Sequence, residues 1–379
     1  MAAPRISISY GNDVYLVTFV TVEHDVKYKD KEMKAMAIIV FPPFMDWSWM
    51  KQRPQHLMTQ FARAGHSVYY CNKTSIKQAP EPLEPNLVLV HHHERWLYEE
   101  FPKIRQCRKD KEPIILWCML PTIYPFVHHY SPDLIIYDCV DDMPEWTPFE
   151  SQMVATSHAV ICTSERLKQR LCKQYPHKRV QLVRNGYNPD MQLHHSTKGV
   201  SHRPSDLPSG QLIGFVGAWA TWIDTLLIQR VAKALANEAS VVLIGPEFGR
   251  RNMGRSESNL HLLGHKPHHL LPSYIRQFSV CLIPFRRIPI ALAANPVKAY
   301  EYLASGAPVI STSLPECILM HPHVVIAHTP EQFINKVRQY LYDRGDPEPR
   351  IQYALSNTWE QRYQDIHKLI VELLDPFND

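Results

Sequence analysis

The chain has 379 residues, a length typical of two domains. Hydrophobic residues make up 45% and charged residues 21%, as in an ordinary soluble globular protein. The formal net charge of +4 is too small to indicate a nucleic-acid-binding protein. No apolar run approaches the roughly 18 residues that span a bilayer, and charged residues interrupt any export signal near the N-terminus. The eight cysteines form no Cys-x-x-Cys pair, so we expect reduced thiols in a cytoplasmic protein.

Residues 1–34 form an N-terminal extension to which the sequence gives no function, although SISYGNDVYLVTFVTVEHDV alternates enough for a strand or hairpin. A regular pattern then begins. Short apolar runs, among them AMAIIVFP, HSVYYCN, PIILWCML and LIIYDCVDD, alternate with amphipathic segments such as PQHLMTQFARAG. Such alternation predicts a parallel sheet covered by helices on both faces. Residues 35–190 are therefore expected to form a first Rossmann-like α/β domain.

A polar stretch rich in Ser, Pro and Gly, residues 191–210, is the expected linker. The same alternation restarts with LIGFVGAW and continues through 211–345, which predicts a second doubly wound domain. Residues 346–379 contain an amphipathic helix from about 357 to 374. Ligands of open parallel sheets bind beyond the carboxyl ends of the strands. The two domains are therefore expected to present loops to a cleft between them.

The segment NPVKAYEYLASGAPV combines start and stop signals of a helix with two charged residues. Asn295 is expected as the N-cap with proline at the first helical position, and Gly306 ends the helix. The free N–H groups would point into the cleft, where Lys298 adds a charge suited to phosphate. Glu301, one turn deeper on nearly the same face, suits the diol of a ribose. This pattern describes a nucleoside diphosphate site; the alternative is an exposed ion pair at i, i+3.

The stretch NPVKAYEYLASGAPVIST resembles the nucleotide-binding helix of GT-B glycosyltransferases, especially of glycosyltransferase family 4. FMDWSWMKQRPQHLMTQFARAGHSVYY, LIIYDCVDDMPEW, LVRNGYNPD and GFVGAWATWID are similar, in the same order, to the teichuronic-acid-type glycosyltransferases. NTWEQR resembles the C-terminal helix that crosses back to the first domain in this fold. The resemblance covers roughly residues 36 to 374. It implies two Rossmann-like domains facing a cleft.

The resemblance also assigns donor-binding roles. Lys298 would contact the diphosphate and Glu301 the ribose, while Asn295 and the N–H groups from Val297 onward would hold phosphate oxygens. The remaining donor residues would be Gly217, where backbone approaches the donor, His265 and Lys266 near the base, and Asp224 at a sugar hydroxyl. His265 is equally readable as an exposed loop residue.

Two departures from the family pattern concern the donor sugar. A second glutamate often precedes the helix glutamate by eight residues in family 4, and this chain has Ala293 there. The usual basic pair after the glycine of the second domain's first strand is replaced by Trp219 and Trp222. Donor identity and stereochemistry therefore remain open.

The acceptor must lose a proton during sugar transfer. In a retaining reaction, which the resemblance implies, the leaving phosphate takes this proton; in an inverting reaction a carboxylate serves as base. Asp141 and Asp142, at the end of a first-domain strand, are the candidates for that role, with helix capping as the alternative. The expected acceptor-binding residues are Trp47, Trp49, Arg53 and His56, although the tryptophans and His56 are also ordinary packing residues.

These observations predict a glycosyltransferase that moves a hexosyl group from a nucleotide-diphosphate sugar to a glycan or glycolipid acceptor. The sequence has neither the Asp-x-Asp of metal-dependent transferases nor His-Glu-x-x-His, so we expect no metal and no cofactor beyond the co-substrate. The alternatives are a nucleotide-sugar epimerase of the same fold and a non-catalytic nucleotide-sugar-binding module. RWLYEEFPKIRQCRKDK would contact an anionic membrane surface if the acceptor is lipid-linked, or otherwise form a solvated loop.

Overall fold

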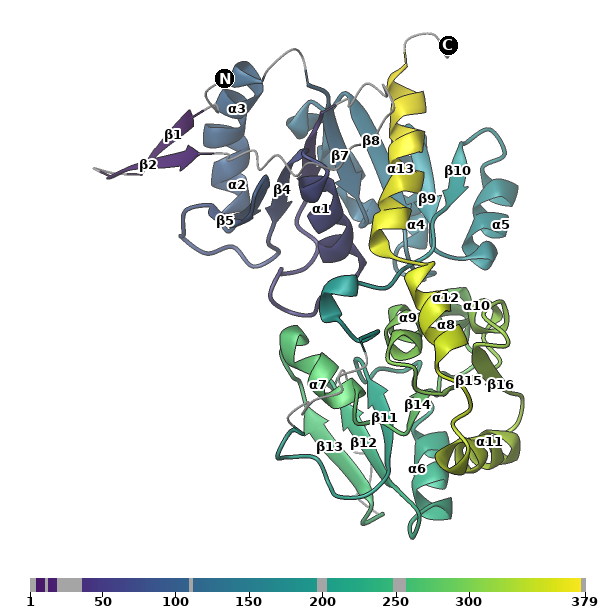
Figure 1. Ribbon diagram of the computed structural model, residues 1–379. Coiled ribbons are helices and arrows are strands. Elements are labelled where there is room, and N and C mark those ends of the chain that lie inside the picture. Colours follow the sequence, from purple (N-terminus) through teal and green to yellow (C-terminus); the bar gives the residue numbers. More distant parts are fainter. Residues whose placement is uncertain are drawn as a thin grey trace.

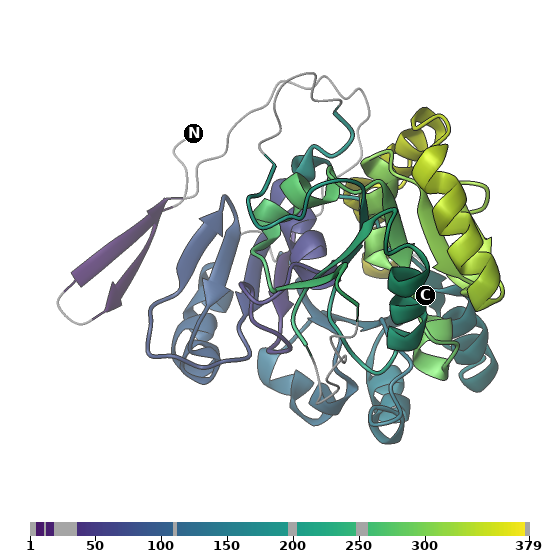
Figure 2. The same cartoon turned by 90° about the horizontal axis from the view of Figure 1, so that it is seen from below.

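The computed structural model describes residues 5–10, 13–18, 36–108, 112–195, 203–247 and 257–375. Two α/β domains follow one another along the long axis of the molecule (Figure 1). A hairpin of β1 (Arg5–Tyr10) and β2 (Asp13–Thr18) projects to one side of the first domain (Figure 2). Of the strand or hairpin expected in the N-terminal extension, the structure has a hairpin. Residues 196–202 of the expected linker lie outside the described part of the chain.

The first domain is built on an eight-stranded sheet of order β10-β9-β8-β7-β3-β4-β6-β5. Every neighbouring pair in it is parallel except β5 with β6. The strands are β3 (Ile38–Phe41), β4 (Ser67–Cys71), β5 (Glu81–Glu84), β6 (Leu87–Val90), β7 (Ile114–Cys118), β8 (Leu134–Cys139), β9 (Ala159–Cys162) and β10 (Val180–Leu182). The central strands are buried on both faces, which explains their continuous apolar runs.

The second domain repeats this design with a six-stranded parallel sheet of order β13-β12-β11-β14-β15-β16. Its strands are β11 (Leu212–Val216), β12 (Ser240–Ile244), β13 (Leu260–Gly264), β14 (Val280–Ile283), β15 (Val309–Thr312) and β16 (Val324–Ala327). The two sheets with their helices confirm the predicted fold class.

Helices cover both sheets and bury apolar side chains against them. In the first domain these are α1 (Arg53–Arg63), α4 (Thr147–Thr156) and α5 (Glu165–Gln174). In the second they are α6 (Thr225–Ala234), α7 (Leu271–Ile275), α8 (Pro289–Ala293), α9 (Val297–Ala304), α10 (Pro315–Ile318) and α11 (Pro330–Tyr342). The short 3₁₀ turn η5 (His268–Leu270) precedes α7.

The chain crosses between the domains twice, and the two crossings lie side by side. The Tyr187 N–H donates to the Asn357 carbonyl at 2.8 Å, and the Trp359 N–H donates to the Tyr187 carbonyl at 3.0 Å. A Cβ at Gly186 would lie 2.8 Å from the Thr358 carbonyl carbon, so only glycine permits this approach. The crossings therefore form one compact joint between the domains.

The C-terminal segment holds two helices. Helix α12 (Glu348–Leu355) packs against α9 in the second domain, and α13 (Trp359–Leu374) packs against α1 in the first (Figure 1). Trp359 and Ile366 are buried in the first domain's core. The predicted crossing of the C-terminal helix is thus confirmed, and the break between the helices falls at the joint.

The segment near residue 100 is helical, so the expectation of a solvated loop is wrong. It forms α2 (His93–Arg95), a π-helical turn η1 (Trp96–Glu100) and α3 (Phe101–Cys107). Trp96 and Phe101 are buried in the core, and their burial outweighs the segment's basic composition.

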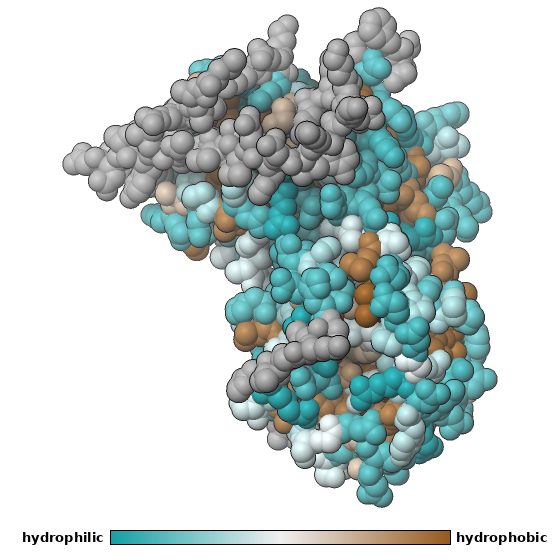
Figure 3. Space-filling model, viewed as in Figure 1, coloured by the Kyte–Doolittle hydropathy of each residue, from teal (hydrophilic) through white to brown (hydrophobic). Residues whose placement is uncertain are grey.

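Hydrophilic residues dominate the face of the second domain seen in Figure 3, with hydrophobic residues in small separate groups. Within the described ranges, no helix is both long and apolar enough to cross a membrane.

Candidate active site

A cavity of about 1080 Å³ lies between the domains. One wall comes from the loop between β3 and α1 and from the loop after β8. The opposite wall comes from the segments after β11, β13 and β14 and from the beginning of α9. All of these segments follow the carboxyl ends of strands, where a parallel sheet binds its ligands. The expected cleft is therefore present.

Helix α9 begins at the cavity. Pro296, Val297 and Lys298 line it, and the first N–H groups of a helix have no acceptors within the helix. The positive end of the helix dipole thus faces the cavity and suits an anion. The expectation that Asn295 caps this helix is wrong, because Pro296 occupies the cap position and the helix begins at Val297.

Asn295 instead hydrogen-bonds at the joint between the domains. Its Oδ1 accepts from the Asn185 N–H at 2.9 Å, and its carbonyl accepts from Asn185 Nδ2 at 2.6 Å. Its Nδ2 donates to Glu316 at 2.9 Å. Asn295 therefore fixes the position of α9 relative to the first domain.

Lys298 reaches the end of β11. A Cβ at Gly217, whose φ is +152°, would lie 2.7 Å from Lys298 Cε, so glycine leaves the room that the lysine fills. Lys298 Nζ lies 5.7 Å and 5.5 Å from the ring centroids of Phe215 and Phe285. Burial lowers the pKa of Lys298, and Glu301 partly opposes this effect. The ammonium thus lies in a low-dielectric corner where an anion would be a strong partner.

Glu301 lies one turn further along α9 and is 7% exposed. Burial raises its pKa to about 7, and the charge of Lys298 acts in the opposite direction. Its carboxylate lines the cavity together with Lys298. The structure thus brings the two charged residues of NPVKAYEYLASGAPV to one wall of the cavity, where Glu301 is buried and Lys298 is half-buried.

On the first domain's side, Arg53 is 3% exposed and pairs with Asp138, with 2.8 Å between Arg53 Nε and Asp138 Oδ2. Arg53 Nη1 also donates to Asn185 Oδ1 at 3.2 Å. Trp117 Nε1 donates to the same Asp138 oxygen at 3.1 Å. Arg53 Nη2 has no hydrogen-bond partner within the described ranges. Arg53 lines the cavity, and its guanidinium is anchored by Asp138.

The two aspartates after β8 have different surroundings. Asp141 lines the cavity, and burial together with the neighbouring Asp142 raises its pKa to about 6. Asp142 pairs with Arg170 at 3.3 Å and is absent from the cavity wall. Of the two candidates, only Asp141 is placed where a substrate would lie.

The aromatic loop before α1 and the loop after β13 meet across the mouth of the cavity. The rings of Trp49 and His265 stack with centroids 5.8 Å apart, and His265 Nε2 lies 3.2 Å from the Trp49 carbonyl oxygen. Trp47 packs edge-on against Tyr70, with centroids 5.0 Å apart. Both tryptophans line the cavity, and 44% of Trp49 is exposed. Trp49 is therefore the more accessible platform for a sugar ring.

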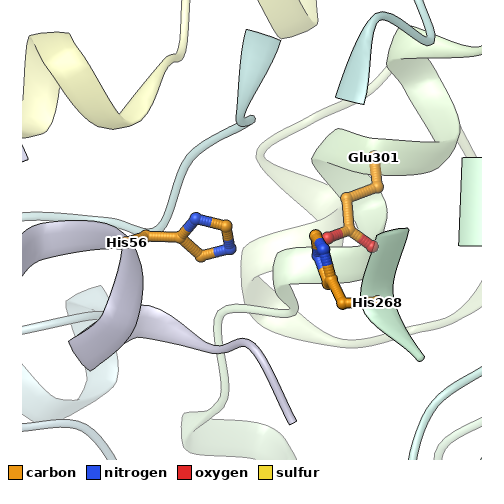
Figure 4. Close-up of side chains that lie close together, drawn as sticks. All are labelled: His56, His268 and Glu301. Carbon is orange, nitrogen blue, oxygen red and sulfur yellow. The ribbon is translucent and has the colours of Figure 1, made fainter. Parts of the chain in front are cut away.

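Three further expected site residues have other partners. Lys266 lines the cavity and pairs with Asp206 at 2.7 Å. Asp224 caps α6 by accepting from the Leu227 N–H at 2.9 Å, and it is absent from the cavity wall. His56 is buried and stacks on Trp359. Figure 4 shows its ring pointing toward His268, which lies beside Glu301.

Sequence reasoning missed four residues of this region. Asp138 pairs with the predicted residue Arg53, and His268 lies against the predicted residue His56. Asn185 and Glu316 hydrogen-bond to Asn295 at the joint between the domains. Asp138 offered a signal, because it is the single charged residue in the apolar run LIIYDC. A charge in a buried strand needs a partner nearby.

Comparisons with solved structures agree with this architecture. Sucrose-phosphate synthase from Thermosynechococcus elongatus aligns over 89% of this chain and 99% of its own, with a TM-score of 0.63 and 15% identity. The trehalose 6-phosphate synthase of Burkholderia multivorans gives 0.60 with 13% identity over 89% and 98%. WaaG, a glycosyltransferase involved in lipopolysaccharide biosynthesis, gives 0.58 with 11% identity over 88% and 99%. The chain therefore has the GT-B fold.

Sequence comparisons define the class of activity. Residues 210–343 match the model of the family described as glycosyl transferases group 1. TuaH of Bacillus subtilis (strain 168), named as a teichuronic acid biosynthesis glycosyltransferase, is 24% identical over 291 residues, 68% of this chain and 72% of its own. The protein is therefore an enzyme of the glycosyltransferase class with the GT-B fold, as the sequence predicted.

Proposed function

We propose that this enzyme transfers a hexosyl group from a nucleotide-diphosphate sugar to an acceptor hydroxyl during assembly of a cell-surface polysaccharide or glycoconjugate. The carrying observation is the placement of Lys298 and Glu301 one helical turn apart in the buried wall of the cavity. The name of the Bacillus subtilis relative supports a polysaccharide product. The eight free cysteines suit a reducing compartment, so we place the reaction in the cytoplasm, with membrane contact if the acceptor is lipid-linked.

The donor's diphosphate would lie against the beginning of α9. There the backbone N–H groups of Val297 and Lys298, and the Lys298 ammonium, would stabilise the charge that develops as the sugar departs. This stabilisation comes from protein groups, so the proposed transfer requires no metal. The Glu301 carboxylate would accept hydrogen bonds from the ribose hydroxyls, and ribose binding would favour its ionised form.

The acceptor would enter from the first domain's wall, beside Trp49 and Asp141. In a retaining reaction the leaving phosphate oxygen takes the acceptor proton, and Asp141 orients the acceptor hydroxyl. In an inverting reaction Asp141 itself takes the proton, for which its raised pKa is suited. The family resemblance favours retention. Ala293, in α8 of the second domain, is fully buried against the first domain's core cluster, which supports a donor site that makes no sugar contact through this residue.

The test is release of nucleoside diphosphate from a panel of UDP-, GDP-, TDP-, ADP- and CDP-sugars, with and without polysaccharide or glycolipid acceptors. The proposal predicts release that depends on an acceptor, with a labelled hexose recovered in the product. Conversion of the donor sugar to an epimer without any acceptor would identify an epimerase. Binding of a nucleotide sugar with no turnover under any condition would identify a non-catalytic module. Either result contradicts the proposal.

A further inference from the structure

Three side chains from separate segments meet beside the cavity, whose wall includes His268 and Glu301 but not His56. His56 comes from α1 of the first domain, whereas His268 comes from η5 and Glu301 from α9 of the second. One potential ligand atom from each lies within 4.8 Å of the others. Figure 4 shows the His56 ring pointing toward His268, whose ring lies beside the Glu301 carboxylate. The cluster therefore spans the two domains.

Two polar atoms of this cluster are buried and lack partners. His56 is 2% exposed and Glu301 is 7% exposed. The Nε2 atoms of His56 and His268 have no hydrogen-bond partner within the described ranges. A buried polar atom without a partner is destabilising, and in a native protein it calls for a partner such as a water, an ion or a ligand. Two such imidazole nitrogens facing one carboxylate indicate a common ligand.

The charges around the cluster are compatible with a cation bound through neutral imidazoles. Burial lowers the pKa of His56 well below its ordinary value and that of His268 to about 4, and nearby Lys51 adds to both effects. Both rings are thus unprotonated at neutral pH, the form that binds metals. Lys298 favours the ionised form of Glu301. Lys51 and Lys298 also repel a cation, so the three ligands must outweigh that repulsion.

We propose that His56, His268 and Glu301 bind a divalent transition-metal ion, with zinc the best match. Two imidazoles, one carboxylate and a water are a common zinc ligand set. Zinc–nitrogen bonds of about 2.0–2.1 Å in a tetrahedral site place ligand atoms roughly 3.3 Å apart. Binding therefore draws His56 of the first domain toward the two second-domain ligands and closes the cleft at this point.

Zinc at this site would affect binding of the donor, an inference that rests on the proposed function. A zinc ion on Glu301 occupies one of its two oxygens and the space beside it, so the carboxylate loses the paired acceptance of hydrogen bonds from two ribose hydroxyls. Zinc and the nucleotide therefore exclude each other, and the metal holds the enzyme in a closed, donor-free form. The ion is an inhibitor of the transfer rather than a participant in it.

The direct test is zinc binding by the full chain after chelator treatment, measured by competition with a chromophoric zinc chelator. The wild type is expected to bind one zinc ion tightly. His268→Gln should weaken that site by about 100-fold or more, because one of three protein ligands is lost. The neighbouring exposed His269→Gln is the matched control and should leave zinc affinity unchanged. Cobalt(II) in place of zinc should give the visible absorption of a tetrahedral site in wild type and in His269→Gln, and should not give it in His268→Gln.

The chain has 21 histidines, so weak zinc binding elsewhere is expected. No tight site in the wild type, or equal tight binding by His268→Gln, would overturn the proposal. His56→Gln supplies an independent check, with its melting temperature compared to wild type because His56 stacks on Trp359. A folded His56→Gln protein that retains the tight site would likewise overturn it.

The competition with the donor is measured separately. One equivalent of zinc should abolish binding of the nucleoside diphosphate to wild type and to His269→Gln. Tight zinc binding with no nucleotide binding at any zinc level would leave the metal site standing and contradict the proposed function. Nucleotide binding with no tight zinc site would agree with the proposed function and contradict the metal site. Simultaneous tight binding of both ligands would refute their mutual exclusion.

Discussion

Asn185 and Asn295 join the two domains through a pair of hydrogen bonds of 2.9 and 2.6 Å immediately before α9. Asn295 also donates to Glu316, which accepts from the Glu165 N–H at 2.9 Å and from Arg184 Nε at 2.8 Å. The beginning of the donor-binding helix is thus held by the first domain. Donor affinity should therefore depend on the Asn185–Asn295 contact, because that contact fixes the position of α9.

Asn295→Ala tests this dependence. The variant leaves buried groups of Asn185 and Glu316 with fewer partners, so the free energy of unfolding should fall by about 2–3 kcal/mol. Nucleoside diphosphate affinity should fall by roughly tenfold or more because α9 loses its fixed position. Urea unfolding and calorimetric titration measure the two effects.

Asn259→Ala is the matched control. Asn259 lies in the second domain, is also buried and is absent from the cavity wall. Its Nδ2 donates to the Ala232 and Ala239 carbonyls at 3.0 and 2.9 Å. It should lose comparable stability and keep its nucleotide affinity. Equal nucleotide affinity in both variants would show that the joint does not position α9.

Gly217→Ala should remove the room that Lys298 occupies. The added Cβ would lie 2.7 Å from Lys298 Cε at a φ of +152°, so both the backbone and the lysine must move. Gly210→Ala is the control, since Gly210 has a φ of +81° and no atom within 4 Å of an added Cβ. Each variant should lose about 1–3 kcal/mol of stability from backbone strain. Only Gly217→Ala should lose nucleotide binding, and a normal affinity there would exclude the proposed position of Lys298.

Asp141 should make stability depend on pH. Its pKa is about 6 in the folded protein against 3.8 for the free side chain. Between these values the folded state binds more protons than the unfolded state, so the free energy of unfolding falls as pH rises from about 4 to 6. Above pH 6 the free energy of unfolding stays at this lower value. Asp141→Asn removes the titrating carboxyl, so the variant should be more stable than wild type by about 1–3 kcal/mol at pH 7.5. At pH 4 the two proteins should have similar stability.

The same variant should transfer sugar more slowly, by about 100-fold if Asp141 acts as a base. Denaturant unfolding across pH 4–8 and initial rates check the two parts. A variant with the stability curve of wild type would mean that Asp141 is solvated in the folded state.

The sequence predicted most strands because a doubly covered parallel sheet demands continuous apolar runs, as in LIIYDC of β8 and LIGFV of β11. It missed β5, whose run EPLE is largely polar, β13, whose run LHLLG is interrupted by a histidine, and the four-residue β16. Helix α4 was also missed, because TPFESQMVAT has little amphipathic periodicity. Short or interrupted patterns are resolved only by tertiary packing.

The candidate site divides in the same way. Lys298 and Glu301 were predictable because one helix sets their spacing. The partners of Arg53 and Asn295 lie 85 and 110 residues away in the chain, and no local pattern reports such pairs. The sequence indicated Asn295 as a helix cap because Asn is favoured at that position. In the structure the long-range hydrogen bonds to Asn185 outweigh this local preference.

The central claim is that α9 binds a nucleoside diphosphate through Lys298. It is tested most directly by melting temperatures of wild type, Lys298→Ala and the exposed-lysine control Lys233→Ala with UDP, GDP, TDP, ADP and CDP. A ligand at about a hundred times its Kd adds roughly 2.7 kcal/mol. We predict that one nucleotide stabilises wild type and Lys233→Ala and leaves Lys298→Ala unchanged. Equal stabilisation of all three proteins, or of none, would contradict the account.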